Sequence, residues 1–242
     1  MAVRWLDKYE VDQAYRVFKD SLDYSKVVVD SGLGAFSRPY VSESSGLQRL
    51  HIGASFFGTV GGYAWASQHS SSKVPEMTVR AWRGKKLERE TETDSHGKYY
   101  IGSLPPLTYQ LQFVSATHKL VTSVPTEIHP GEYRQVDCVA GQYAVWRGYP
   151  NVETRDFTLL MHELTHAWQS QHGKSMFLSG LGCQILDTVE GDAYSFGAGE
   201  AWGDYNIEQQ ASIVATWYGY GCRDFGKLWP YIRDYVRKGK TD

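Results

Sequence analysis

Residues 162–166 read His162-Glu163-Leu164-Thr165-His166, and this H-E-x-x-H stretch decides how the chain is interpreted. Apolar side chains recur around it at helical spacing, which predicts a helix over residues 151–171, with Asn151 as the candidate N-cap and Gly173 after its end. Residues four apart share one face of a helix, so both imidazoles can reach one metal ion. Glu163 points elsewhere, toward the water of a catalytic metal site, and is the candidate general base. The alternative is a chance match in which both histidines are hydrogen-bonded core residues.

A catalytic zinc site of this kind has a third protein ligand. His172 has the spacing of the third histidine in H-E-x-x-H-x-x-G-x-x-H sites, but Gln169 stands at the place of the glycine. Because that glycine lets the chain turn back, an unbroken helix would carry His172 away from the metal.

Glu208 is a better candidate for the third ligand. Residues 204–214 have the apolar spacing of a second helix, with Asp204 as its predicted N-cap, and a glutamate on a packed helix would complete a His-His-Glu set. Glu190 and Glu200 compete with it, although the glycines around them favour loops. On composition alone Glu208 would be a solvated surface residue, so the pattern leaves this choice open.

Two blocks of sequence together resemble a family of bacterial zinc metallopeptidase domains, found at or near the C-terminus of VgrG spike proteins in type VI secretion systems. The blocks are HELTHAWQ (162–169) and DYNIEQQA (204–211), and VFKDSLDYSKV (17–27) is similar to the N-terminal part of that family. The resemblance implies a zinc cofactor held by His162, His166 and Glu208, with Glu163 as the general base. The stretch from Leu178 to Gly203 matches no pattern that we can use.

The resemblance also implies a biological role. The chain would be an antibacterial effector, made in the cytoplasm without a signal peptide and delivered by a type VI apparatus into the periplasm of a rival cell. Its expected partners are a protein or peptide substrate, the VgrG spike and an immunity protein. An oxyanion-stabilising group is also expected, and nothing in the sequence selects it among Tyr194, Tyr205, Tyr218 and Tyr220.

The sequence pattern changes at Val74. From there, short stretches in which apolar and polar residues alternate are separated by turns, and this pattern predicts a β-sandwich. The predicted strands are 77–82, 87–93, 99–101, 109–114 and 135–139. Residues 93–109, TDSHGKYYIGSLPPLTY, resemble transthyretin-like or carboxypeptidase-regulatory modules. Three histidines fall in this region and are read as turn or surface residues: His96, His118 and His129.

The expected fold class is therefore α+β, a zincin-like metallopeptidase domain with an inserted transthyretin-like all-β sandwich. The sandwich would span residues 73–140, and residues 1–72 and 141–242 would form the metallopeptidase domain. Within 1–72 we expect a helix over 5–20, β-prone stretches at 24–29 and 47–57, and a linker from Gly61-Gly62 through residues 68–73.

Bulk properties limit the alternatives. A net charge of −2 argues against a nucleic-acid partner, and no apolar run is long enough for stable membrane insertion. The three cysteines form no C-x-x-C pair, and free buried thiols are the expected state, with a Cys183–Cys222 disulfide after export as the alternative. Two rival functions remain. One is a non-catalytic adaptor module of a secretion spike, whose structural zinc would need a fourth ligand such as His172 or Cys183. The other is an intracellular housekeeping metallopeptidase.

Overall fold

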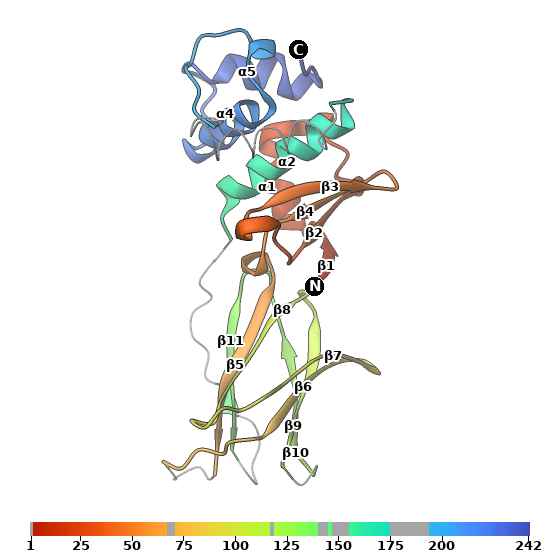
Figure 1. Ribbon diagram of the computed structural model, residues 1–242, viewed down its shortest axis with the longest axis vertical. Helices are drawn as coiled ribbons and strands as arrows, with labels where there is room; N and C mark the ends of the chain where they lie inside the picture. Colours follow the sequence, from red (N-terminus) through yellow and green to blue (C-terminus); the bar gives the residue numbers. More distant parts are fainter. Residues whose placement is uncertain (1, 67–70, 117–118, 140–144, 147–154, 175–193) are drawn as a thin grey trace. The chain divides into compact units, whose positions relative to one another are not determined.

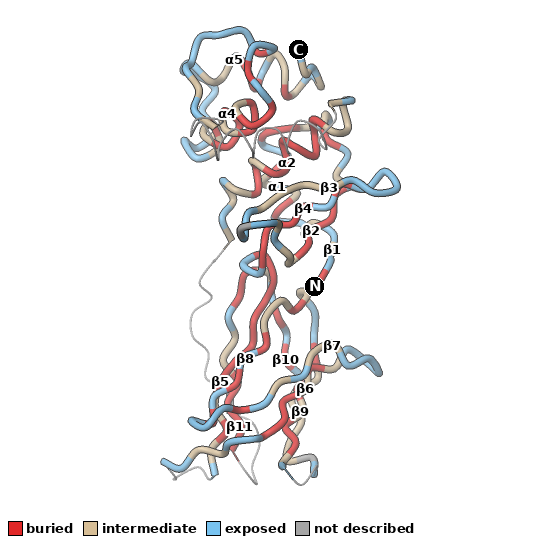
Figure 2. The backbone as a smooth tube through the Cα atoms, in the orientation of Figure 1, coloured by how far each residue is buried: buried red, intermediate tan, exposed pale blue. Residues whose placement is uncertain are grey.

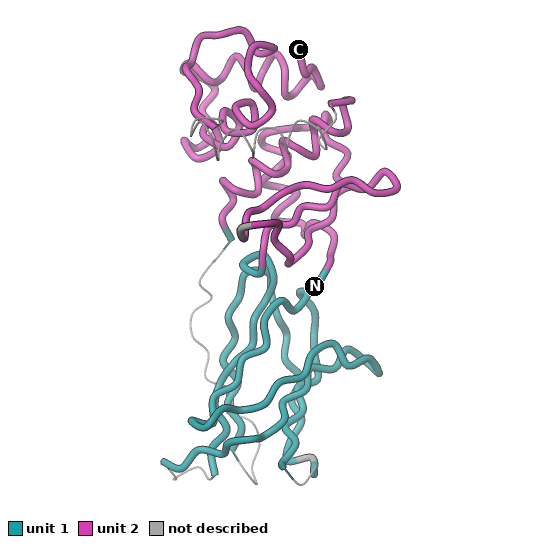
Figure 3. Tube along the Cα trace, in the orientation of Figure 1, with its two compact units in different colours: residues 1–2, 54–155 teal, residues 3–53, 156–242 magenta. Residues whose placement is uncertain are grey.

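The computed structural model describes residues 2–66, 71–116, 119–139, 145–146, 155–174 and 194–242. The chain forms two compact units, coloured separately in Figure 3. Unit 1 comprises residues 1–2 and 54–155, and unit 2 comprises residues 3–53 and 156–242. The architecture is mixed α and β, as predicted. The limits of the units fall at 53/54 and 155/156, whereas the sequence pattern had suggested 72/73 and 140/141.

Unit 1 consists of two four-stranded sheets (Figure 1). The first contains, in spatial order, β10 (Leu120–Glu127), β9 (Thr108–Val114), β6 (Thr78–Arg83) and β7 (Lys86–Glu92), all antiparallel. The second contains β12 (Val145–Trp146), β11 (Tyr133–Val139), β5 (Gly58–Trp65) and β8 (Lys98–Leu104), with β11 and β5 parallel. The five predicted strands are present. β5 and β10 were not predicted as strands.

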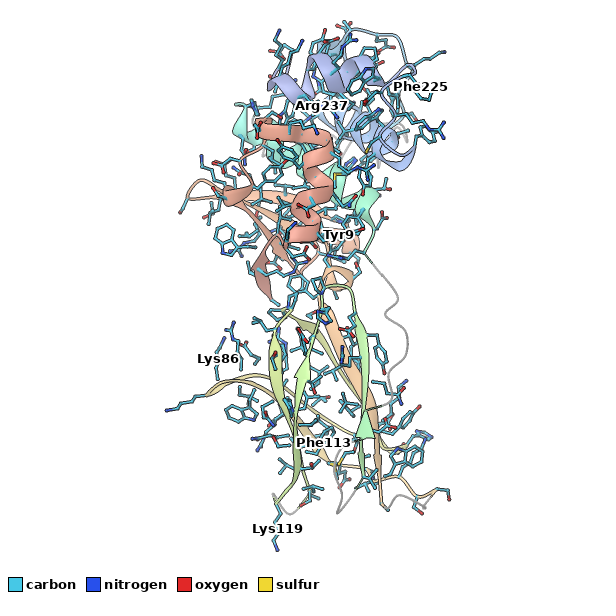
Figure 4. The ribbon with its side chains drawn as sticks, turned by 180° about the vertical axis from the view of Figure 1, so that it is seen from behind. Tyr9, Lys86, Phe113, Lys119, Phe225 and Arg237 are labelled. Carbon is cyan, nitrogen blue, oxygen red and sulfur yellow. The ribbon has the colours of Figure 1, made fainter. Side chains whose placement is uncertain are left out.

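Both sheets contribute alternate residues to one shared core. Val79 and Phe113 from the first sheet are buried in the same apolar cluster as Ile101 and Val136 from the second. Figure 2 shows this burial along the strands, and in Figure 4 Phe113 lies among them whereas Lys86 extends outward. Period-two burial of this kind is what places one face of each strand in a sandwich interior.

The start of unit 1 differs from the prediction because Gly61 and Gly62 lie within β5 and not in a linker. A Cβ on Gly62 would collide with the carbonyl of Val136, and one on Gly61 would approach the Tyr133 hydroxyl within 2.7 Å. The two glycines therefore allow β11 to approach β5 closely. The sequence suggested a linker because a pair of glycines looks the same in a flexible linker and in a strand that a neighbour approaches closely.

Unit 2 contains the third sheet, with strand order β1 (Val3–Trp5), β2 (Val27–Asp30), β4 (Leu47–His51) and β3 (Tyr40–Ser44). β2 and β4 are parallel, and β1 and β3 are antiparallel edge strands. Helix α1 (Lys8–Phe18) begins with a capping box between Asp7 and Glu10. The 24–29 stretch, predicted to be β-prone throughout, begins with a 3-10 turn, Tyr24–Lys26, before β2.

The described residues of unit 2 form three further α-helices: α2 (Phe157–Gln171), α4 (Ile207–Gly219) and α5 (Trp229–Asp234). Helix α2 lies between the sheet and α4 (Figure 1). It is therefore buried on most sides, which explains why apolar and polar residues alike are buried from Leu160 to Gln169, with His162 as the exception. Among the described residues, no helix combines the length and apolar character that crossing a membrane requires.

Candidate metal centre

Helix α2 carries the two histidines. It begins at Phe157, later than predicted, because the Asp156 carboxylate caps it by accepting hydrogen bonds from the amides of Thr158 and Leu159. The predicted cap, Asn151, lies outside the described residues. The helix ends as predicted, with Gly173 at a φ of +86°, a conformation that glycine adopts without strain.

Helix α4 carries Glu208. Its N-cap is Asn206, which forms a capping box with Gln209, and not the predicted Asp204, which lies in a preceding 3-10 turn. Glu208 is thus in the first turn of the helix. The unpaired amides and the positive end of the helix dipole favour a carboxylate at this position.

His162, His166 and Glu208 converge between α2 and α4. Glu208 Oε2 lies 3.1 Å from Nε2 of both histidines, and the two Nε2 atoms are 3.2 Å apart. Three atoms bound at about 2.0–2.1 Å to one tetrahedral ion would lie about 3.3 Å from one another. The spacing and the donor set, two imidazoles and one carboxylate, therefore fit a bound metal ion, and this group could hold one.

The electrostatics of the group are strongly coupled. Burial disfavours the charged form of His166, but the neighbouring Glu208 carboxylate outweighs it and raises the pKa of His166 to about 9. Burial likewise opposes ionisation of Glu208, but His166 and His162 outweigh it and hold the pKa of Glu208 well below its usual range. The site thus keeps an anionic oxygen between two imidazoles.

Glu163 follows the first histidine and is buried, with 4% of its surface exposed. Within the described residues, its Oε2 atom has no hydrogen-bond partner. Burial raises the pKa of Glu163, an effect that His166 and His162 oppose. A buried carboxylate with an unused oxygen costs free energy unless a polar group pairs with it, so this atom is a candidate partner for a water molecule at the site.

The other candidate ligands lie elsewhere. His172 Nδ1 is 2.8 Å from the carbonyl oxygen of Trp168 on its own helix. The backbone of exposed Glu200 binds Tyr205 and Tyr231. Glu190 and Cys183 fall outside the described residues, and so does the predicted pairing of Cys183. Of the group that the sequence offered, the structure brings together His162, His166 and Glu208.

Tyr194 is the tyrosine beside the site. Its ring centroid lies 6.1 Å from that of His162, the most exposed of the three candidate ligands, with 16% of its side chain exposed. The residue after it is tied to α4, because Gln209 Nε2 donates to the Ser195 carbonyl at 2.7 Å. Among the described residues, Tyr194 therefore lies beside the most exposed of the three candidate ligands.

The other three tyrosines have different surroundings. The Tyr205 hydroxyl donates to the Gly197 carbonyl, and the Tyr218 hydroxyl donates to Gln13. Tyr220 is 68% exposed. The predicted surface histidines His96 and His129 are indeed exposed, while His118 lies outside the described residues.

A second buried histidine in unit 2, His51, was not singled out by the sequence. Its Nε2 lies 2.9 Å from the Ser42 hydroxyl, its ring stacks on Tyr40 at 4.0 Å, and its Nδ1 is 3.8 Å from Asp30 Oδ2. The other Asp30 oxygen accepts from the Gly32 amide. Burial lowers the pKa of His51 although Asp30 opposes the shift.

Comparison with known proteins gives one sequence relative. The chain is 42% identical over 62 residues to the type VI secretion system spike protein VgrG2b of Pseudomonas aeruginosa. The match covers 25% of this chain and 6% of that protein, so the chain spans a small part of its relative. No family model matches the chain.

Solved structures give distant likenesses. The N-terminal domain of AlgF from P. aeruginosa is 18% identical, and the match covers 39% of this chain and 95% of that one with a TM-score of 0.27. GBS52, the minor pilin of Streptococcus agalactiae, is 14% identical, with coverage of 45% and 52% and a TM-score of 0.28. Scores this low carry no argument about function.

Proposed function

We propose that this chain is a zinc-dependent endopeptidase of the His-His-Glu class that acts as an antibacterial effector of a type VI secretion system. The observation that carries the proposal is the convergence of His162 Nε2, His166 Nε2 and Glu208 Oε2 within 3.2 Å of one another. Beside them lies the buried Glu163 carboxylate, one oxygen of which is unpaired within the part of the chain that the structure describes. On this proposal unit 2 is a zincin-like catalytic domain and unit 1 a transthyretin-like module that serves docking.

Two imidazoles and a carboxylate on an H-E-x-x-H helix are a donor set of catalytic zinc, which when bound would supply an acidified water and polarise the scissile carbonyl. Glu163 would accept the proton of the attacking water and transfer it to the leaving amine. Its buried position supports this role, because a raised pKa makes a carboxylate a better proton acceptor near neutral pH. Tyr194 is the side chain we assign to the oxyanion, since it lies beside His162 at the more exposed side of the site.

The secretion role rests on the match to VgrG2b. A spike protein travels with the effectors that it carries, so a chain related to one segment of a spike is a candidate cargo. The VgrG spike, an immunity protein and a periplasmic target are the partners that this role requires.

The adaptor alternative is less favoured. A structural zinc site is closed by four protein ligands, and within the described residues three ligands converge while His172 bonds to its own helix. The proposed catalytic site needs no fourth protein ligand.

The test is growth inhibition by the chain when it is exported to the periplasm of a susceptible bacterium. Wild type should inhibit growth, and Glu163→Ala at equal abundance should not. Purified wild type should also cleave denatured protein, lose this activity to a chelator and regain it with one equivalent of zinc. A toxic Glu163→Ala variant, or wild type that cleaves nothing when loaded with zinc, would count against the proposal.

A further inference from the structure

Two glutamines form a buried amide pair between α2 and α4, next to the candidate metal ligands. Gln169 and Gln210 have no exposed surface. Gln169 Oε1 lies 2.9 Å from His166 Nδ1, and Gln169 Nε2 donates to Gln210 Oε1 at 3.0 Å. The pair therefore joins a ligand on α2 to the helix that carries Glu208.

The direction of the Gln169 amide is fixed by the backbone. Gln169 Nε2 also lies 3.0 Å from the Ile207 carbonyl, an oxygen that only accepts hydrogen bonds. The NH2 group of Gln169 must face that carbonyl, so its oxygen faces His166. An oxygen at this place needs a proton on His166 Nδ1, so Nε2, which faces Glu208 and His162, is the nitrogen left to bind a metal ion.

The direction of the Gln210 amide is fixed in the same way. Gln210 Nε2 donates to the carbonyl of Trp202 at 3.0 Å and lies 3.4 Å from that of Thr241. Its oxygen must then face Gln169 and accept from it. The carbonyls of Ile207 and Trp202 thus fix the two amides independently. Both require that Gln210 accepts from Gln169 and that Gln169 accepts from His166.

We infer that Gln169 and Gln210 are positioning residues for the zinc ligand His166: together they hold its ring and keep the proton on Nδ1, so that Nε2 is free to bind the metal. The inference rests on the proposed zinc site. Partners that hold the second nitrogen of a metal-bound histidine fix its tautomer and orientation, and their loss weakens metal affinity by about 10–100-fold.

The first experiment measures zinc affinity by chelator competition in Gln169→Met and in a matched control, Gln171→Met. Gln171 lies two residues further along α2 and also makes three hydrogen bonds, to both backbone groups of Asp23 and to Gln48, none of them near the metal ligands. Gln169→Met should bind zinc about 10–100-fold more weakly than wild type. Gln171→Met should bind it as wild type does, although both variants lose three hydrogen bonds.

Gln210→Met provides an intermediate case and does not depend on Gln169→Met folding. It removes the acceptor for one Gln169 proton but keeps the bond to Ile207. Its loss of zinc affinity should fall between those of Gln169→Met and Gln171→Met.

A spectroscopic readout separates positioning from general stability. The proton on His166 Nδ1 should exchange slowly with water in 15N-labelled wild type and in Gln171→Met, with and without zinc. In Gln169→Met it should exchange too fast to observe. Equal zinc affinities for Gln169→Met and Gln171→Met would overturn the inference, and so would a slowly exchanging Nδ1 proton in folded Gln169→Met.

The two proposals fail in different ways. Zinc binding that depends on Gln169, in a protein that cleaves no peptide, would remove the peptidase function and leave the positioning role intact. If the protein cleaves peptides but its zinc affinity is unchanged by substitution of Gln169 or Gln210, the peptidase function stands and the positioning role is lost. Wild type that binds no zinc would overturn both.

Discussion

The buried cluster at His166 and the buried cluster at His51 combine an imidazole with a carboxylate, yet their geometries differ. At His166 the Glu208 oxygen lies 3.1 Å from two imidazole nitrogens, and one oxygen of the Glu163 carboxylate has no hydrogen-bond partner among the described residues. At His51 the carboxylate of Asp30 stands 3.8 Å away, and the second ring nitrogen meets the Ser42 hydroxyl.

The shifts in pKa follow this difference. Glu208 outweighs burial and raises the pKa of His166. At His51 burial, aided by Arg49, outweighs the more distant Asp30, and the pKa of His51 falls. Residue type and burial therefore do not distinguish a metal ligand from a structural histidine. The distinguishing feature is that three ligand atoms converge within 3.2 Å of one another, beside a carboxylate oxygen that lacks a hydrogen-bond partner among the described residues.

The largest expected effect is loss of metal from the first cluster. His166→Ala removes one of three ligands and should weaken zinc binding by more than the about 10–100-fold typical of a lost hydrogen-bond partner. His51→Asn is the matched control and should leave the stoichiometry at one zinc per chain. Elemental analysis after exhaustive dialysis measures both, and a full complement of zinc in His166→Ala would break the comparison.

The next largest effect distinguishes the roles of two carboxylates in this cluster, those of Glu163 and Glu208. Glu163→Gln should keep zinc and fold, with a change in stability of roughly 1 kcal/mol or less, and should reduce kcat by about 10²–10⁴-fold. Glu208→Gln removes an anionic ligand, so it should lose zinc as well as activity. Zinc content measured beside peptide cleavage decides the matter. The assigned roles are falsified if Glu163→Gln, loaded with zinc, is as active as wild type.

A smaller effect concerns the pH dependence of stability at the second cluster. The pKa of His51 is lower in the folded state than the about 6.5 of an unfolded chain, so the unfolded state binds more protons as pH falls below that value. Stability from this residue is complete above about pH 6.5 and is lost toward acid, with a slope of at most about 1.4 kcal/mol per pH unit.

Urea unfolding of wild type and His51→Gln at pH 7 and pH 5 tests this sign, because other groups cancel in the difference. Wild type should lose more stability than the variant on acidification. The opposite order would mean that Asp30 raises the pKa of His51, and the contrast between the clusters would disappear.

The smallest expected effect is on zinc affinity after removal of unit 1. Deleting residues 54–155 and joining Gly53 to Asp156 through a short Gly/Ser linker keeps both histidine clusters, so zinc affinity should be unchanged. Deleting only residues 73–140 leaves β5 without β8 and β11 and should give an aggregation-prone product. Comparable solubility of the two shortened proteins would show that β5 belongs with the residues before it.

The sequence predicted those parts of the molecule that have a local pattern. Helical spacing located both helices of the site, and period-two alternation located five strands of unit 1. Helix starts were less accurate: Asp156 and Asn206 cap α2 and α4, although Asn151 and Asp204 had equally suitable side chains. Several residues near a helix start can cap it, and packing selects among them.

Features that depend on tertiary contact left weaker signals. Glu208 was selected through a family resemblance and not through its own spacing. Gln169 was noted only as a missing glycine, although it and Gln210 each stand in one of the two blocks that together carried the resemblance. The hydrogen bond between them offers a physical reason why the two blocks are informative as a pair.

Unit 2 is built from two segments of the chain, residues 3–53 and 156–242, which are separated by unit 1. This arrangement has a consequence for the order of folding during synthesis. Asp23 bonds to Gln171, and the carbonyl of Val17 accepts from Arg237, contacts that span 148 and 220 positions of the chain. The first segment of unit 2 must therefore wait while roughly a hundred residues of unit 1 are made, about 5–20 s at ordinary elongation rates. Unit 1 is continuous from residue 54 onward and can fold during that interval. We therefore expect the sandwich to fold before the histidines and Glu208 can meet, and the candidate metal centre to form after it.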